Sequence, residues 1–188
     1  MALVKTFINH PVVELTRVQA VKDGHHFTQY KMADGVTELE NGMLVNADHV
    51  KGTVGKASAI TEKVYLHASV EHVYNGEGRD QFVLKATDDF LPRIYELKTG
   101  DKFETNAVVF TDTASTGFAP AGTIATIFGT VATMLESGKV YATVCVTAGG
   151  EAYIELLSTE PTADVVLEVE KVVTLPNNTR GFKFVVTK

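Results

Sequence analysis

The strongest constraint on the fold is a short phrase that recurs along the chain: a polar residue, a glycine, and then a run in which apolar and other residues alternate. It occurs at Glu40–Val45, at Lys98–Phe110 and at Glu136–Tyr141. Glycine adopts the positive φ that a tight turn requires, and alternation with a period of two is typical of a strand. The phrases therefore predict β-turn-β corners in a chain built of short strands.

The stretch Tyr95–Phe110 shows this pattern most completely. A turn is expected at Lys98–Asp101, where Gly100 supplies the positive φ, and a strand at Phe103–Phe110. If that strand is extended throughout, alternate residues share a face. One face would then carry Phe103, Thr105, Ala107 and Val109, and the other Lys102, Glu104, Asn106 and Val108.

Further strands are expected at short intervals on both sides of this stretch. Those before it are Met43–Val45, Lys63–Ser69, Gln81–Ala86 and Ile94–Leu97, and those after it are Lys139–Thr147, Glu151–Leu157, Val165–Leu175 and Phe182–Thr187. The spacing favours small antiparallel sandwiches or barrels over βαβ units, because no long helical pattern separates the strands. The sequence thus predicts a mainly β protein.

One segment, 113–135, contains no charged residue. It is long enough to span a membrane, but its threonines, glycines and proline argue against that interpretation. From Ile124 to Leu135 the apolar residues recur at helical spacing, which predicts a short helix over about 123–135 after a linker at 113–122. A strand remains the alternative, because threonine and glycine weaken helix propensity.

These features divide the chain into an N-terminal arm at 1–40, a β subdomain at 41–112, the linker at 113–122, and a C-terminal β subdomain with the helix at 123–188. The first part alternates only weakly and is interrupted by Pro11. Such a segment forms either an edge strand or an extended arm laid on a neighbouring subunit. We expect the arm.

Charge and cysteine content argue against several classes of protein. The 17 lysines and arginines against 23 acidic residues give a formal net charge of −6. This balance argues against nucleic acid as the main partner, because phosphate binding draws on a basic surface. The single cysteine, Cys145, permits no disulfide within the chain, and we expect it as a small buried side chain on a strand. The start of the chain lacks the basic and apolar regions of a secretion signal.

The chemistry-bearing residues form no recognisable constellation, so no catalytic, cofactor-binding or metal-ligating residue is predicted. His67 and His72 stand five residues apart, which places them on opposite faces of a strand. A hydrolase would require one of them to meet Asp88 or Asp89. A receptor- or glycan-binding module would instead use the loop Asn75–Arg79 together with Tyr65, Tyr74, Tyr95, Tyr141 and Tyr153.

Two stretches of the chain resemble a known class of proteins. ENGMLVNADHVKGTVGKAS, followed by EKVYLHASVEHVY, and LKTGDKFETNAVVF are similar to segments of capsid-associated β proteins of tailed bacteriophages, of the capsid-decoration and head-fibre-base type. The resemblance covers roughly residues 38–112.

This resemblance implies a non-enzymatic structural protein that is made in the host cytoplasm and then binds the exterior of the virion capsid. Its partners would be the major capsid protein or other virion proteins. A homo-oligomer is expected, because most assemblies of identical chains are closed and symmetric. The arm at 1–40 and the uncharged segment at 113–135 would form the contact surfaces, and neither nucleic acid nor membrane is expected as a partner.

Overall fold

The computed structural model describes residues 3–24, 26–27, 29–57, 63–69, 82–88, 90–111, 118 and 124–188. Of these described residues, 43% lie in strands and 12% in helices, which confirms the prediction of a mainly β protein. In the first part of the chain the elements are β1 (Leu3–Lys5), β2 (Val13–Arg17), α1 (Gln19–Asp23), β3 (His26–Phe27), β4 (Lys31–Met32), β5 (Glu38–Leu39), β6 (Leu44–Asp48), β7 (Thr53–Lys56), β8 (Tyr65–His67), β9 (Leu84–Lys85), β10 (Ile94–Glu96), β11 (Lys102–Thr105) and β12 (Val108–Thr111). The remaining elements are α2 (Ile124–Ser137), β13 (Tyr141–Val146), β14 (Ala152–Leu157), β15 (Val166–Thr174) and β16 (Arg180–Val186).

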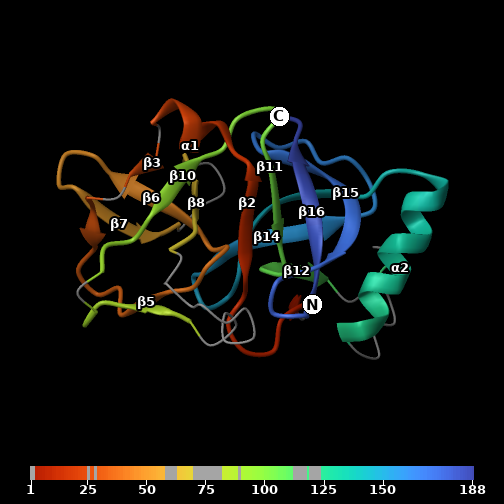
Figure 1. The fold of residues 1–188 in the computed structure, drawn as a ribbon, viewed down its shortest axis with the longest axis horizontal. Helices are drawn as coiled ribbons and strands as arrows, with labels where there is room; N and C mark the ends of the chain where they lie inside the picture. The colour runs from red at the N-terminus through yellow and green to blue at the C-terminus, as the bar shows by residue number, and fades with distance from the viewer. Residues whose placement is uncertain are drawn as a thin grey trace.

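Most described strands join one large sheet, with the order β2-β11-β16-β15-β13-β14-β6-β8-β10-β3. The sheet is mixed rather than purely antiparallel, because β12 pairs with β14 and β4 with β7 in parallel. A small second sheet contains β5 and β9. In Figure 1, β6, β7, β8 and β10 gather on the left of β2, while β11, β15 and β16 lie on its right with α2 outermost.

The sheet buries both of its faces along its central strands. On β6, Leu44 belongs to the larger hydrophobic cluster and Val45 to the smaller one, and on β8 Leu66 and Tyr65 divide in the same way. Successive residues therefore enter two different cores, as the pleat of a strand requires. Full burial of such a side chain contributes about 1.5–3 kcal/mol, so both cores stabilise the sheet.

The strand expected at Phe103–Phe110 is interrupted at Asn106, between β11 and β12. The Asn106 side chain accepts a hydrogen bond from the Val12 N–H at 2.7 Å, and its carbonyl accepts one from the Val108 N–H at 2.8 Å. This local turn shifts the alternation by one residue. Phe103 and Phe110 consequently lie in the same cluster, whereas an unbroken strand would place them on opposite faces.

The first forty residues contribute strands to the chain's own sheet. β1 pairs with β12, and β2 pairs with β11 at the edge of the large sheet. Val12 and Val13 are buried, at 3% and 6% exposure. β1 and β2 therefore fit the edge-strand alternative, and the expected arm laid on a neighbouring subunit does not describe them. The physical reason is that β1 and β2 cover backbone groups and apolar side chains of β11 and β12.

The expected division into two β subdomains is not visible in the described residues. Pairing of β11 with β16, of β12 with β14 and of β6 with β14 joins strands from both sides of the predicted linker in one sheet. Within the linker at 113–122 only Phe118 is described. Its ring lies 6.5 Å from that of Phe110, in the larger cluster.

The predicted helix is present as α2 and packs beside β15. Ile127, Phe128 and Val131 are buried, whereas Thr126 and Thr133 face solvent. The Phe128 ring stacks on Phe182 of β16 at a centroid distance of 4.9 Å. Tertiary packing thus holds a helix whose threonines disfavour it. Across the described residues, no helix combines the length and the hydrophobicity that a membrane crossing requires.

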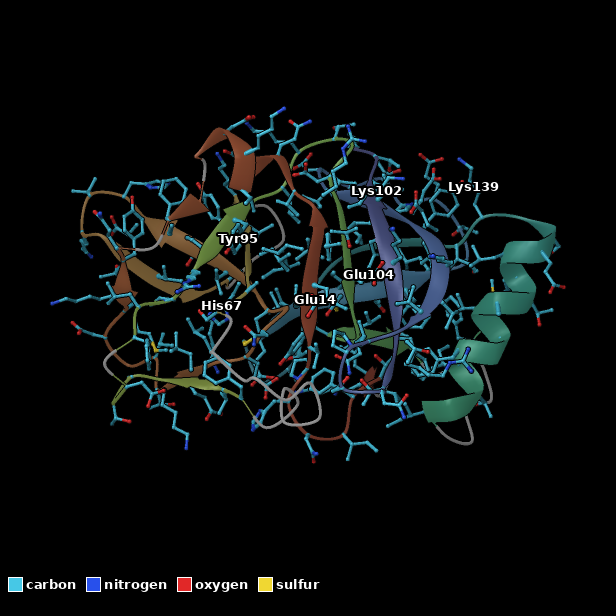
Figure 2. The ribbon with its side chains drawn as sticks, in the orientation of Figure 1. Glu14, His67, Tyr95, Lys102, Glu104 and Lys139 are labelled. Atoms are coloured by element: carbon cyan, nitrogen blue, oxygen red, sulfur yellow. The ribbon has the colours of Figure 1, made fainter. Side chains whose placement is uncertain are left out.

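The outer face of β2, β11, β16 and β15 carries charged side chains. Figure 2 shows Glu14 on β2 beside Glu104 on β11, and the two are cross-strand partners. Lys183 on β16 lies 3.5 Å from Glu104 and 3.9 Å from Glu170, and Lys102 pairs with Glu170. The side chains of these pairs are 17–32% exposed, and ion pairs that remain in contact with solvent are worth little individually, so we interpret this face as a partly solvated surface.

Candidate functional site

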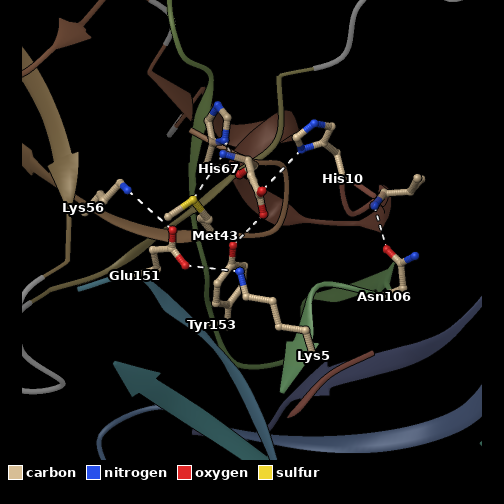
Figure 3. A network of polar contacts seen from close by, with 10 residues as sticks. Lys5, His10, Met43, Lys56, His67, Asn106, Glu151 and Tyr153 are labelled. Carbon is tan, nitrogen blue, oxygen red and sulfur yellow. Dashed lines mark hydrogen bonds and ion pairs between the residues drawn. The ribbon is translucent and has the colours of Figure 1, made fainter. Parts of the chain in front are cut away.

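Polar side chains from distant parts of the chain converge on Glu40, directly after β5. The Tyr153 hydroxyl donates a hydrogen bond to Glu40 Oε2 at 2.6 Å, and His10 Nδ1 lies 3.3 Å from Oε1 (Figure 3). Burial raises the pKa of Tyr153, and the contact with Glu40 raises it further. Tyr153 therefore stays protonated and acts as a donor. The Glu40 carboxylate is thus held between Tyr153 on β14 and His10 in the loop that joins β1 to β2.

A buried histidine extends this network through the backbone of Glu40. His67 Nδ1 donates to the Glu40 carbonyl at 2.7 Å, and Nε2 accepts from the Ser69 hydroxyl at 2.8 Å. Ser69 Oγ in turn accepts from the Arg93 N–H at 3.0 Å. Burial lowers the pKa of His67 to about 4, so its ring is neutral at pH 7.

A serine bonded to a histidine is the pairing that activates a nucleophile. Here His67 is fully buried and Ser69 is only 5% exposed. Every side-chain polar atom of the pair already has a partner within the fold, which is the pattern of a structural polar network. The sequence prediction did not include Ser69, because a buried serine close to a histidine carries no signal of its own.

The turn that holds Glu40 depends on a close approach at Gly42. Its φ is +79°, and its N–H donates to the His67 carbonyl at 2.7 Å. A Cβ placed on Gly42 would lie 2.1 Å from the Cβ of Ala107. Only glycine fits this position, so the network and the β11–β12 break are locked together here.

Two lysines surround a second carboxylate at the edge of the network. Lys5 lies 3.3 Å and Lys56 3.7 Å from Glu151. The Lys5 ammonium also lies 5.0 Å from the centroid of the Tyr153 ring, within the range of a cation–π contact. These contacts tie β1 and β7 to the residue directly before β14.

Of the residue pairs considered for a hydrolase, only His67 with Asp88 lies within the described residues, and each of these two side chains bonds to other groups. Asp88 lies in an exposed turn, where its carboxylate accepts from the Lys85 N–H at 2.7 Å, and His67 is engaged with Ser69 and Glu40. Asp89 and His72 lie outside the described residues. Among the residues that the structure describes, no group of three or more metal-ligating side chains could hold a metal ion.

The tyrosines considered for glycan binding point mainly inward. Tyr65, Tyr95 and Tyr153 are buried at 2%, 8% and 0% exposure, and Tyr141 is half-buried. Tyr74 and the loop Asn75–Arg79 lie outside the described residues. The buried rings pack in the cores, where a sugar has no access to their faces.

An aromatic cluster that the sequence did not predict surrounds His49. Tyr30 Oη lies 2.7 Å from His49 Nδ1, and Tyr65 Oη lies 3.0 Å from Nε2. Phe27 stacks on Tyr30 at 5.4 Å. These contacts hold the β6–β7 turn, and the sequence signal for them is weak because Tyr30 and His49 are separated by several strand boundaries.

Cys145 is half-buried on β13. Burial raises the pKa of its thiol to about 12, and the nearby Glu155 carboxylate adds to the effect. The thiolate that nucleophilic chemistry requires is therefore scarce at neutral pH.

A second candidate site lies at the surface, where segments far apart in sequence enclose a hollow of about 350 Å³. We call it the loop–helix pocket. It lies between the loop that joins β1 to β2, the first turns of α2 and the start of β16. Its lining residues are Thr6, Phe7, Ile8, Asn9, His10, Asn106, Ile124, Phe128, Thr179 and Arg180.

The walls of the loop–helix pocket are mainly apolar, and its rim carries a cation. Phe7 and Phe128 are nearly buried, while Ile8 is 86% exposed at the rim. The guanidinium carbon of the exposed Arg180 lies 5.5 Å from the centroid of the Phe128 ring. His10 lines the pocket and also contacts Glu40, so the pocket adjoins the buried network.

No family model, no curated protein and no solved structure matches this chain in the comparisons with known proteins. Function is therefore inferred from the chain's own residues and from the resemblance over residues 38–112.

Proposed function

We propose that this protein is a non-enzymatic structural protein of a tailed-phage virion, which binds the exterior of the capsid through its surface. Its partners are the major capsid protein or other virion proteins, and it acts as a homo-oligomer. The observation that carries the proposal is the loop–helix pocket. Residues 6–10 and the start of α2 come from the two segments expected to form the contact surfaces, and they meet in one apolar hollow.

The titratable residues Glu40 and His67 are already bonded to other groups of the fold, which supports a binding role over a catalytic one. The carboxylate of Glu40 contacts Tyr153 and His10, and both ring nitrogens of His67 are bonded within the fold. These groups rigidify the sheet on which the pocket is built. A rigid sheet with surface loops is a typical scaffold for a binding surface.

The N-terminal segment keeps a role in this proposal, but a different one from that of a free arm. β1 and β2 anchor it in the sheet, and the loop between them is available to a partner. The exposed Ile8 lies in this loop. We place the capsid contact there and at α2.

Virus particles test the proposal directly. Particles from a culture in which the encoding virus replicates are purified by density gradient and labelled with an antibody against the recombinant chain, then viewed by immunogold electron microscopy. We expect label over the exterior of the capsid at many positions per particle. Label confined to the tail, or the chain present only in the soluble fraction, would refute the proposal.

A further inference from the structure

We infer that the loop–helix pocket binds a peptide segment of a partner protein in which an apolar side chain stands next to a carboxylate. The apolar side chain enters the pocket, and the carboxylate pairs with Arg180. The inference deepens the proposed function, on which it rests for the identity of the partner as a virion protein.

The lining of the pocket defines the apolar part of the ligand. Phe7 of the β1–β2 loop and Ile124 and Phe128 of α2 form the hydrophobic wall, and a hollow of about 350 Å³ is within the size range of ligand sites. Burial of an aliphatic or aromatic side chain there would remove apolar surface of both partners from water. This transfer is the main favourable contribution to most protein association.

Arg180 defines the charged part of the ligand. Its guanidinium carbon lies over the Phe128 ring, 5.5 Å from the centroid, and a guanidinium carries five N–H donors that can pair with a carboxylate. Among the residues that the structure describes, the ring of Phe128 is the one group that makes an electrostatic contact with the Arg180 guanidinium. His10, the other basic group in the lining, already faces Glu40. In a chain with a formal net charge of −6, this rim is thus a local site for a negative group.

The shape of the site favours a peptide segment over a small amphiphile. Ile8 lines the pocket and is also 86% exposed, so the apolar wall of the pocket reaches the open surface of the protein. A peptide that places one side chain in the pocket would lay its next residues across Ile8. A small ligand held between Phe7 and Phe128 would contact Ile8 at the edge of the pocket but leave most of its side chain in water.

Selection from random short peptides tests the inference with the full chain. Displayed peptides are selected on the immobilised protein, and we expect enrichment of an apolar residue within two positions of Asp or Glu. Arg180→Glu should abolish this preference and favour Lys or Arg beside the apolar residue. Arg17→Glu, the same change at an exposed arginine of β2, should leave it unchanged. Circular dichroism spectra of both variants serve as the control for folding.

The affinity of an enriched peptide then measures each contact. We expect Arg180→Glu to weaken binding roughly tenfold or more, as loss of a charge-assisted hydrogen bond does. Ile8→Ser should weaken it by a smaller factor. In methyl NMR spectra the signals of Ile8 and Ile124 should shift on binding, whereas those of Ile154 in the core should not.

Several results would overturn the inference. These are selection of peptides without an acidic residue, shifts at sites remote from Ile124, and binding of octanoate in the pocket with no peptide bound. The same Arg180→Glu variant separates the two proposals. If it still binds capsids as the wild type does, the inference fails and the proposed function stands; if peptides bind as expected but capsids do not, the proposed function fails.

Discussion

The substitution Gly42→Ala should destabilise the protein strongly, because two independent penalties act at this position. Its φ of +79° lies in the left-handed region, which costs a residue with a Cβ about 1–2 kcal/mol. The new Cβ would lie 2.1 Å from Ala107 Cβ and 3.1 Å from Thr105 Oγ1, where ordinary contacts are 3.4–4 Å. Overpacking of this kind costs about 1–3 kcal/mol. We therefore expect a total loss of about 2–5 kcal/mol.

Gly100→Ala provides the matched control for this measurement. Gly100 also has a positive φ, of +93°, but apart from its chain neighbours no atom lies within 4 Å of the position that a Cβ would occupy. It should lose only the backbone contribution of about 1–2 kcal/mol. The double variant Gly42→Ala/Ala107→Gly should recover part of the loss, since the overlapping methyl group is removed.

Urea denaturation at constant m value measures these differences as shifts in the midpoint. The expected order of stability is wild type, then Gly100→Ala, then Gly42→Ala. If Gly42→Ala unfolds at the same urea concentration as Gly100→Ala, the turn after Glu40 does not approach Ala107 closely, and the account of the locked network is refuted.

The buried contacts lead to four more predictions. Deletion of residues 1–17 should give an insoluble or unfolded chain by circular dichroism, because β1 and β2 complete the sheet; a folded, soluble remainder would restore the free arm. Because the pKa of His67 is about 4 in the folded protein against 6.5 in the unfolded chain, its contribution to stability is present above pH 6.5 and is lost as pH falls toward 4. Near pH 5 the loss is about 2 kcal/mol, so His67→Gln should show a flatter dependence of unfolding free energy on pH, and an unchanged slope would contradict the assignment. Tyr153→Phe removes a donor to Glu40 and should cost about 1–3 kcal/mol in urea denaturation; no loss would show that the pair is not formed. The Cys145 thiol should react with Ellman's reagent only as the protein unfolds, and rapid reaction of the native protein at pH 8 would contradict its burial and raised pKa.

The sequence was sufficient for features that depend on neighbouring residues. Gly42 and Gly100 adopt the positive φ expected at two of the three corners. The third expected corner, at Glu136–Tyr141, is instead the end of α2 followed by β13, and Gly138 does not adopt a positive φ. The helix at 124–137 follows from the spacing of Ile127, Phe128 and Val131. These predictions succeed because a turn and an amphipathic helix are specified within a few residues.

Features that depend on distant contacts could not be predicted. The break at Asn106 requires the Val12 N–H, 94 residues earlier in the chain, and Glu40 meets Tyr153 across 113 residues. The local alternation over Phe103–Phe110 therefore indicates one continuous strand where the structure has two. β1 and β2 alternate too weakly to reveal that they join the sheet, and their place is set by pairing with β12 and β11.

The loop–helix pocket shows the same limit for function. Ile8 and Ile124 belong to segments that the sequence marked as surfaces, but nothing in their order indicates that they share one hollow with Arg180. The charge pattern of the sequence did not indicate this site either. Arg180 can be recognised as part of a binding site only from its position beside Phe128.

Rebinding to virus particles tests the central claim most directly. Particles produced without this protein are mixed with increasing amounts of the purified chain and sedimented, and the bound amount per particle is measured by quantitative mass spectrometry. The account predicts saturable binding at a fixed copy number that follows the symmetry of the capsid. Absence of the chain from sedimented particles at all concentrations, or binding that rises without saturation, would contradict it.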